Sequence, residues 1–489
     1  MQPTTRSRIT VIIIMSICLL GAGAASVEVE AAELLIGGAT TSITPEGPVA
    51  VSGQFPTRIA QTVENPVTAT ALALETREQD KVIDQAIMVS CDLVAIRGTI
   101  QEQLRERVKP RLAGFDVKKL LLNATHTHTG PVTEEGTYVI PKEGVMQPAE
   151  YVEFLLERLG NVVVQAWDGR KPGGVSWALG HAVVGHNRRA VYADGTAQMY
   201  GDTATPRFRN IEGYEDHGVE MLFFWDKEQK LTAVAINIAC PSQEVESRST
   251  VNADFWHDVR EELHKRYGED LYVLAWTGAS GDQSPHLMWR KAAEERMRTL
   301  RGLTRTQEIA RRIVAAVDDV YPLAKSDIRT DPVLVHRVES LQLPVRKVTE
   351  EELAQAKARV EELSGKPDPS TADVRRRLWH QEVIDRYEKQ DDSPFYEMEL
   401  HAIRLGDVAI ATNPFELFID FGVQIKAQSK AVQTFVIQLA CASGIYVPTE
   451  KAVRGGGYSA IIESNLVGPE GGQVLVERTV EAINAAWNP

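Results

Sequence analysis

Cysteine is scarce in this chain of 489 residues, with four residues in all. Cys18 lies in an apolar N-terminal run, which leaves Cys91, Cys240 and Cys441 for the rest of the chain. Three cysteines form at most one bridge, so a small disulfide-stapled domain is excluded. The composition, with 43% hydrophobic and 25% charged residues, is instead that of an ordinary globular protein with a sizeable core.

An excess of positive charge is also missing. The chain has 53 Lys and Arg residues against 67 Asp and Glu residues, and its formal net charge is -14 at pH 7. No long basic stretch offsets this negative charge. Because nucleic acids and anionic membranes attract basic surfaces, we expect no nucleic-acid partner and no electrostatic docking to a membrane.

Long apolar runs are absent beyond the N-terminus. Residues 9–20 are mostly apolar, Arg6 and Arg8 precede them, and Ala-Gly-Ala follows at 22–24. This pattern is typical of a secretory signal peptide, and the run is too short to span a bilayer comfortably. We therefore predict a signal peptide over residues 1–25, export to the periplasm or beyond, and no transmembrane span in the mature chain. An uncleaved N-terminal anchor is the alternative.

Strand-like and helix-like patterns alternate along the rest of the chain. Short apolar or alternating runs predict strands, and apolar residues spaced by three or four predict helices. The segment 34–45 is predicted to be a short strand followed by a loop that contains Gly and Pro. Strands are predicted at 67–75, 83–91, 120–122, 175–184, 218–225, 231–239, 271–276, 398–405, 408–412 and 434–440, and helices at 100–112, 148–167, 254–266, 304–320 and 472–486. This order predicts an α/β fold, with mixed sheet layers flanked by helices, in a single domain over residues 33–489.

The stretch at about 349–390 differs from its surroundings in composition. It is rich in Glu, Arg, Ala and Lys, and Gly-Lys-Pro-Asp-Pro interrupts it at 365–369. Charged residues at helical spacing indicate solvated helices, and the Gly/Pro break separates two of them. We predict a helical hairpin inserted in, or packed on, the main domain. A coiled-coil surface is the alternative, although the heptad pattern is short.

Two histidines follow a run of three leucines in the segment 120–131. This pattern predicts a buried strand that leads into a loop. In an extended segment His126 and His128 point to the same side, because side chains alternate along a strand. Two imidazoles at a strand end form half of a metal site, and hydrogen-bonded or surface histidines are the alternative.

Polar and reactive residues follow many of the other predicted strands. The ends of strands in an α/β sheet converge, so these residues can share one crevice, although each alone also fits turn or capping chemistry. They are Asp92, His126, His128, Asn187, Arg188, Cys240, Asp282, Ser284, Glu416 and Tyr446.

Five motifs occur in one order along residues 34–464. They are Thr-His-Thr-His-Thr-Gly-Pro at 125–131, Asn-Arg at 187–188, Gly-Asp-Gln-Ser-Pro at 281–285, Pro-Phe-Glu at 414–416, and Ile-Tyr-Val-Pro-Thr at 445–449 followed by Tyr458. In sequence and order these motifs resemble the catalytic domain of the neutral/alkaline non-lysosomal ceramidases. The histidine motif and the spacing of the two tyrosines carry most of the resemblance.

The resemblance implies a zinc-dependent amidase. His126, Glu416 and Tyr446 would bind Zn²⁺ at the positions of the family's ligands. The implied partner is a small N-acyl molecule, with sphingolipids among the candidates.

The resemblance also assigns roles to four further residues. His128, Arg188 and Tyr458 would line the site and contact the substrate or the transition state. Ser284 matches the serine at the floor of the family's active site. A serine nucleophile is disfavoured, because no Gly-x-Ser-x-Gly elbow surrounds it.

The sequence departs from the family at one metal ligand. Cys240, in Ile-Ala-Cys-Pro-Ser at 238–242, stands where the family has its second zinc histidine. A cysteine thiolate binds zinc, so Cys240 is a predicted ligand. Its added negative charge would weaken the metal as a Lewis acid. A different metal, no metal, or His257 as a substitute ligand are the alternatives.

These observations predict an exported zinc-dependent amidohydrolase in which metal-bound water attacks an N-acyl amide. A zinc hydrolase of a non-lipid acyl substrate, such as an acylated amino acid, sugar or peptide, is the second interpretation. A secreted binding protein that has lost catalysis on the same scaffold is the third.

Overall fold

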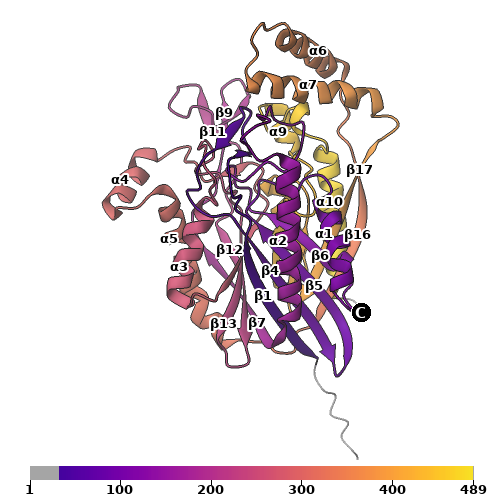
Figure 1. The fold of residues 1–489 in the computed structure, drawn as a ribbon. Helices are drawn as coiled ribbons and strands as arrows, with labels where there is room; N and C mark the ends of the chain where they lie inside the picture. The colour runs from indigo at the N-terminus through magenta and orange to yellow at the C-terminus, as the bar shows by residue number, and fades with distance from the viewer. Residues whose placement is uncertain (1–31, 488–489) are drawn as a thin grey trace, which may run out of the picture. The chain divides into compact units, whose positions relative to one another are not determined.

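A computed structural model describes residues 32–487 (Figure 1). The predicted signal peptide over residues 1–25 lies outside the described residues. Within 32–487, no helix is both long enough and apolar enough to cross a membrane.

The larger of two main sheets has eight strands in the order β14-β13-β12-β7-β1-β4-β5-β6. Neighbours pair antiparallel in its centre, and the edge pairs β13–β14 and β5–β6 are parallel, so the sheet is mixed. Its strands are β1 (Glu33–Ser42), β4 (Thr68–Glu78), β5 (Lys81–Cys91), β6 (Leu120–Ala124), β7 (Lys171–His181), β12 (Gly218–Asp226), β13 (Leu231–Ile238) and β14 (Tyr272–Thr277).

A second sheet of four strands packs on one face of the first. Its strands, in spatial order, are β16 (Leu334–Pro344), β17 (Phe395–Leu405), β18 (Val408–Thr412) and β20 (Gln433–Ile437). Leu74 and Leu222 of the larger sheet belong to the same buried cluster as Ile403 and Phe435 of the smaller one. Strands buried on both faces are apolar along their whole length, which is why so many of them read as continuous hydrophobic runs.

Helices cover the outer face of each sheet (Figure 1). On the larger sheet these are α1 (Ile100–Val108), α2 (Pro148–Asp168), α3 (Phe255–Tyr267) and α5 (Arg305–Ser326). On the smaller sheet they are α8 (Ile419–Gln428) and α10 (Pro469–Ala485). The layers are therefore helix, sheet, sheet and helix, which confirms the predicted α/β class with mixed sheets flanked by helices.

Two further helices, α6 (Glu350–Ser364) and α7 (Thr371–Lys389), form a hairpin between β16 and β17. Each begins with a capping box, made by Thr349 with Glu352 and by Ser370 with Asp373. The hairpin packs on the main domain through a small apolar cluster in which its Ala356 and Val383 join Val348 and Ile462.

Short strand pairs bring distant segments together near the ends of the main strands. The pairs are β8 (His186–Asn187) with β15 (Gln283–Ser284), β19 (Glu416–Leu417) with β21 (Tyr446–Val447), and β2 (Val49–Val51) with β3 (Arg58–Ala60). A small sheet of β9 (Arg189–Tyr192), β10 (Ala197–Met199) and β11 (Phe208–Ile211), the helices α4 (Lys291–Arg301) and α9 (Glu450–Gly455), and three 3-10 turns (Lys109–Arg111, Val117–Lys119, Ile462–Ser464) complete the chain.

Candidate active site

His126 lies two residues beyond the end of β6 and has a left-handed backbone, with φ 67°. A non-glycine residue adopts this conformation only where its surroundings hold it. Its backbone N–H donates to the carbonyl of Leu93 at 2.9 Å, and its Nδ1 lies 2.6 Å from the carbonyl of Val94. Because a carbonyl only accepts, Nδ1 carries the proton, and Nε2 keeps a free lone pair for a ligand.

His126 and His128 meet, as predicted, but not because of strand alternation. The backbone has left the sheet at Ala124, and the left-handed turn at His126 brings the two rings together. Their Nε2 atoms are 3.2 Å apart.

Glu416 and Tyr446 reach the same place through the parallel pair of β19 and β21, in which they are direct partners. The Glu416 Oε2 lies 3.3 Å from the Nε2 of His126, and the Tyr446 hydroxyl also hydrogen-bonds to Glu416. Burial acts to raise the pKa of Glu416, but its interactions with the neighbouring His126 and Arg188 hold it below its ordinary value. Glu416 is therefore ionised at neutral pH and available to a cation.

Gln243 fixes the proton on His128. Arg188 Nη1 donates to Gln243 Oε1 at 2.9 Å, so the amide nitrogen of Gln243 faces His128 Nε2, at 2.8 Å, and donates to it. Burial first, and then the neighbouring His126 and Arg188, keep the pKa of His128 well below its ordinary value. His128 is thus neutral at pH 7, and its Nδ1 lies 3.4 Å from Glu246 Oε2 without a hydrogen bond between them.

The donor set fits a tetrahedral metal. The Nε2 atoms of His126 and His128 lie 3.2 Å apart, and because Nε2 of His128 accepts from Gln243, the lone pair left for a cation is that of His126 Nε2. Ligands at zinc bond lengths of about 2.0–2.1 Å lie about 3.3 Å from each other, and His126 Nε2 and Glu416 Oε2 have that separation. Imidazole, carboxylate and phenol oxygen are ligand types compatible with zinc.

Arg188 lies behind the cavity rather than in its lining. It is almost fully buried, and its four hydrogen bonds go to Tyr200, Gln243, the carbonyl of Gly281 and the hydroxyl of Tyr446. With both terminal nitrogens engaged, Arg188 orients a predicted ligand and the partner of His128.

Ser284 also lies behind the cavity. Its hydroxyl accepts from the Tyr200 hydroxyl at 3.1 Å and from the backbone N–H of His286 at 3.0 Å. The side chain is fully buried, so it supports Tyr200 and through it Arg188.

Tyr458 lines the cavity, and 37% of it is exposed. Its ring lies 5.9 Å from that of Tyr446, edge to face. Desolvation and the nearby charge of Glu416 raise the pKa of Tyr458 to about 12. The hydroxyl therefore keeps its proton at neutral pH and is a hydrogen-bond donor.

Cys240 packs in the apolar cluster beneath α3 and does not line the cavity. Its Sγ lies 3.6 Å from the carbonyl of Val184 and 3.7 Å from that of Pro241. Burial, together with the charges of Asp254 and Glu244, raises the pKa of the Cys240 thiol well above its ordinary value. His257, in the first turn of α3, does not line the cavity either. The ligand role of Cys240 stays a prediction.

A second group of metal-ligand types occurs among residues 32–487. Ligand atoms of Glu399, His401 and Cys441 lie within 4.8 Å of one another, and none of the three lines the cavity. Arg105 donates twice to Glu399, at 2.6 and 3.0 Å, and His401 bridges Glu399 and His336 at 2.7 and 2.8 Å. This group is satisfied by hydrogen bonds and contains a competing guanidinium, so it fits a cation less well.

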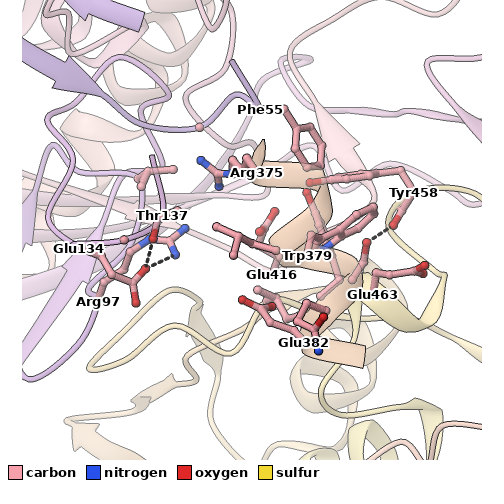
Figure 2. A pocket seen from close by; sticks show the side chains of 18 of the residues that line it. Phe55, Arg97, Glu134, Thr137, Arg375, Trp379, Glu382, Glu416, Tyr458 and Glu463 are labelled. Carbon is pink, nitrogen blue, oxygen red and sulfur yellow. Dashed lines mark hydrogen bonds and ion pairs between the residues drawn. The ribbon is translucent and has the colours of Figure 1, made fainter. Parts of the chain in front are cut away.

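The cavity has a volume of about 510 Å³ and extends from the predicted metal ligands His126, Glu416 and Tyr446 to the α6–α7 hairpin (Figure 2). Its lining includes His126, His128, Glu416, Tyr446 and Tyr458, and also Phe55, Arg97, Glu134, Arg375, Trp379 and Glu382. Sequence reasoning missed the contributions of Gln243, Tyr200 and α7. Gln243 follows β13 in the same loop as Cys240, so the rule that polar residues follow strands could have found it.

No protein-family model and no curated protein matches this sequence. Solved structures match its fold, among them two ceramidases. The neutral ceramidase from Pseudomonas aeruginosa aligns with a TM-score of 0.68 at 16% identity, over 93% of this chain and 75% of that one. A ceramidase complexed with C2 aligns with a TM-score of 0.65 at 15% identity, over the same shares. At these identities the likeness is one of fold, and this chain has the neutral ceramidase fold that its motifs predicted.

Proposed function

We propose that this protein is an exported, zinc-dependent amidohydrolase that acts on a small N-acyl substrate. The observation that carries the proposal is the convergence of His126, Glu416 and Tyr446, with Nε2 of His126 and Oε2 of Glu416 3.3 Å apart in one cavity. The shared fold supports the same class, since both aligned proteins are named as ceramidases. Export rests on the signal-peptide pattern of residues 1–25.

His126, Glu416 and Tyr446 would hold the metal and leave a fourth position for water, whereas Cys240, the further predicted ligand, does not line the cavity with them. When bound there, zinc polarises the amide carbonyl and activates water for attack on it. The Nδ1 bond of His126 to the Val94 carbonyl fixes the tautomer that binding requires.

The other side chains handle protons and charge. His128 is neutral at pH 7, and if its Nε2 exchanges the hydrogen bond from Gln243 for one from the attacking water, it accepts a proton as attack proceeds and returns it to the departing amine. Glu246, 3.4 Å from its Nδ1, stabilises the imidazolium form that arises between these steps. Tyr458 donates its hydroxyl proton in a hydrogen bond to the oxygen that gains negative charge.

A secreted binding protein without catalysis is the rival from another class, and the buried, protonated thiol of Cys240 is the observation that favours it. Metal analysis of the purified mature chain, combined with hydrolysis of N-acyl amides from ceramide to acetyl amines, separates the two. We expect one zinc per chain and amide hydrolysis, both lost in His126→Ala. The matched control is His181→Ala, at an exposed histidine at the end of β7, which retains both. A wild-type chain without metal and without hydrolysis would contradict the proposal.

A further inference from the structure

One face of α7 forms a wall of the candidate active-site cavity. Arg375, Leu378, Trp379, Gln381, Glu382 and Asp385 of this helix all line it. Their spacing by three or four residues puts most of them on one side of the helix. Figure 2 shows Arg375, Trp379 and Glu382 directed into the same space as Glu416.

The hairpin is fixed to the loops that carry other lining residues. Thr371 accepts a hydrogen bond from the backbone of Thr57 at 3.0 Å, and Arg375 donates to the carbonyl of Gln54 at 3.3 Å. On the other side His380 bonds to Glu463 at 3.0 Å, and Arg386 donates to the carbonyl of Ile462 at 2.9 Å. These bonds make α7 a built part of the cavity wall.

Three aromatic rings form a continuous contact from α7 toward Tyr446, one of the predicted metal ligands. Trp379 lies 5.4 Å from Phe55 and 5.6 Å from Tyr458, and Phe55 lies 6.1 Å from Tyr458. Tyr458 in turn contacts Tyr446. This triad of Phe55, Trp379 and Tyr458 is a compact apolar surface, large enough for a short chain or a small ring.

Much of the rest of the lining is charged, with more acid than base, beside apolar positions such as Val94, Leu378 and Ile445. Besides Glu416 it includes five carboxylates, of Glu134, Glu135, Glu382, Asp385 and Glu463, against the guanidinium groups of Arg97 and Arg375. Arg97 pairs with Glu134 at 3.2 Å, and Arg375 lies 4.0 Å over the ring of Tyr138. Among residues 32–487, Glu382 has neither an ion-pair nor a hydrogen-bond partner, so it is available to a substrate.

Such a wall is unsuited to long alkyl chains. Covering ionised carboxylates with methylene groups removes water from them and gives nothing in exchange. A neighbouring hollow of about 420 Å³ contains Phe395 and Leu466, but it shares Glu382 and Asp385 with the cavity, so a chain would have to cross both charges to enter it.

We propose that the α6–α7 hairpin sets substrate specificity, and that it selects a short N-acyl amide whose remaining part is polar and either uncharged or positively charged. The aromatic triad contacts the short apolar part, and Glu382 faces the polar part. This inference rests on the proposed amidohydrolase function and narrows its substrate class.

The test uses four amides and the full mature chain. N-acetylputrescine, N-acetyl-4-aminobutanol and N-acetyl-4-aminobutyrate differ in charge at one end, and N-palmitoylsphingosine has two long chains. We expect kcat/KM for the cationic and neutral amides to exceed that for the anionic amide about tenfold. We expect the lipid to be the poorest substrate of the four.

Variants of α7 test whether this helix causes the predicted ranking of the four amides. Glu382→Gln should reduce the preference for the cationic over the anionic amide about threefold and should change kcat/KM for the neutral amide less than for either charged amide. Trp379→Ala should raise KM for the short amides about tenfold, and Trp379→Phe should restore most of the loss. The matched control is Glu388→Gln, which removes the same charge from the same helix at an exposed position outside the cavity lining and leaves every value unchanged.

The outcomes separate this inference from the proposed function. If the lipid is the best substrate, or if the α7 variants leave the substrate order unchanged, the specificity inference is overturned while amide hydrolysis stands. If no amide is hydrolysed, the proposed function fails, and calorimetric binding of the three acetyl amides decides the inference. The inference is upheld if the cationic and neutral amides bind more tightly than the anionic amide and Trp379→Ala weakens their binding. It is overturned if none of the three amides binds.

Discussion

Gly53 lies against the ring of His128, with a backbone φ of 99° that side chains rarely tolerate. A Cβ built on Gly53 would collide with the imidazole itself. Two features therefore require glycine at position 53: its left-handed backbone, and the close approach of His128, the predicted proton carrier.

Gly53→Ala should lower both stability and activity. The backbone strain alone costs about 1–2 kcal/mol, and the collision displaces His128 from Gln243. Thermal unfolding and kcat/KM would be measured together. Gly195→Ala is the matched control, because its φ is 83° but nothing lies within 4 Å of the added carbon. Gly195→Ala should lower the melting temperature but retain activity. Equal activity in Gly53→Ala and Gly195→Ala would contradict the prediction.

Gln243→Ala should reduce kcat/KM about 10–100-fold while the chain stays folded. The substitution removes the donor to His128 Nε2 and the acceptor for Arg188 Nη1, so the tautomer of His128 is no longer fixed. A profile of kcat/KM against pH tests this role, since the apparent pKa of the limb that depends on His128 should shift. Gln103→Ala, at an exposed amide of α1 that bonds only to Thr99, should leave the profile in place.

Removing metal should destabilise the wild-type chain. A metal present at about 1,000 times its dissociation constant stabilises the folded state by about 4 kcal/mol, so dipicolinate should lower the melting temperature by about 5 °C. Re-addition of zinc should restore it. The His126→Ala chain lacks a ligand, so its melting temperature should be the same with and without the chelator. A lower melting temperature of this variant in dipicolinate would show that the metal binds at another site.

Asp254 should make stability depend on pH. Burial raises its pKa from an ordinary 3.8 to about 7, although the backbone N–H groups of Val245 and Phe255 act in the opposite sense. Between these two values the folded state binds more protons than the unfolded state, so stability falls as pH rises from about 4 to 7 and then levels off. The change is about 4 kcal/mol at most.

Chemical denaturation across this pH range checks the effect of Asp254. Asp254→Asn should reduce the slope, most clearly above about pH 6, because the amide does not titrate; burial also raises the pKa of Asp282, to about 6, so part of the fall below that pH remains. Asp258→Asn, one turn further along α3, should leave the slope as it is in the wild type. An unchanged slope in Asp254→Asn would show that another group is responsible.

The layered fold was predictable because its strands are apolar through most of their length and its longer helices are amphipathic. The prediction missed β16, since Leu334–Pro344 mixes Arg, Glu, Gln and His with apolar residues. That strand is an edge of the smaller sheet, where half-exposed positions tolerate charge. Helix α4 was also missed, because it is strongly charged and none of its residues is buried.

The candidate site was predictable only where a motif marked it. His126, His128, Glu416, Tyr446 and Tyr458 come together in one cavity, whereas Arg188, Ser284 and Cys240 lie outside its lining. Position along the chain cannot distinguish a residue in the cavity from one just behind it. The wall formed by α7 was beyond sequence reasoning, because a charged helix reads as solvated whether it faces bulk water or a polar cavity.

The pairing of β19 with β21 has a consequence for assembly. It places Glu416 and Tyr446 at the end of the smaller sheet, whereas His126 comes from the end of β6 in the larger one. A cation shared by these residues would be a cross-link between segments far apart in sequence, and it would restrict sliding of one sheet over the other. The metal-binding geometry can form only after both sheets have docked, so occupancy by metal would report completed folding rather than guide its early steps.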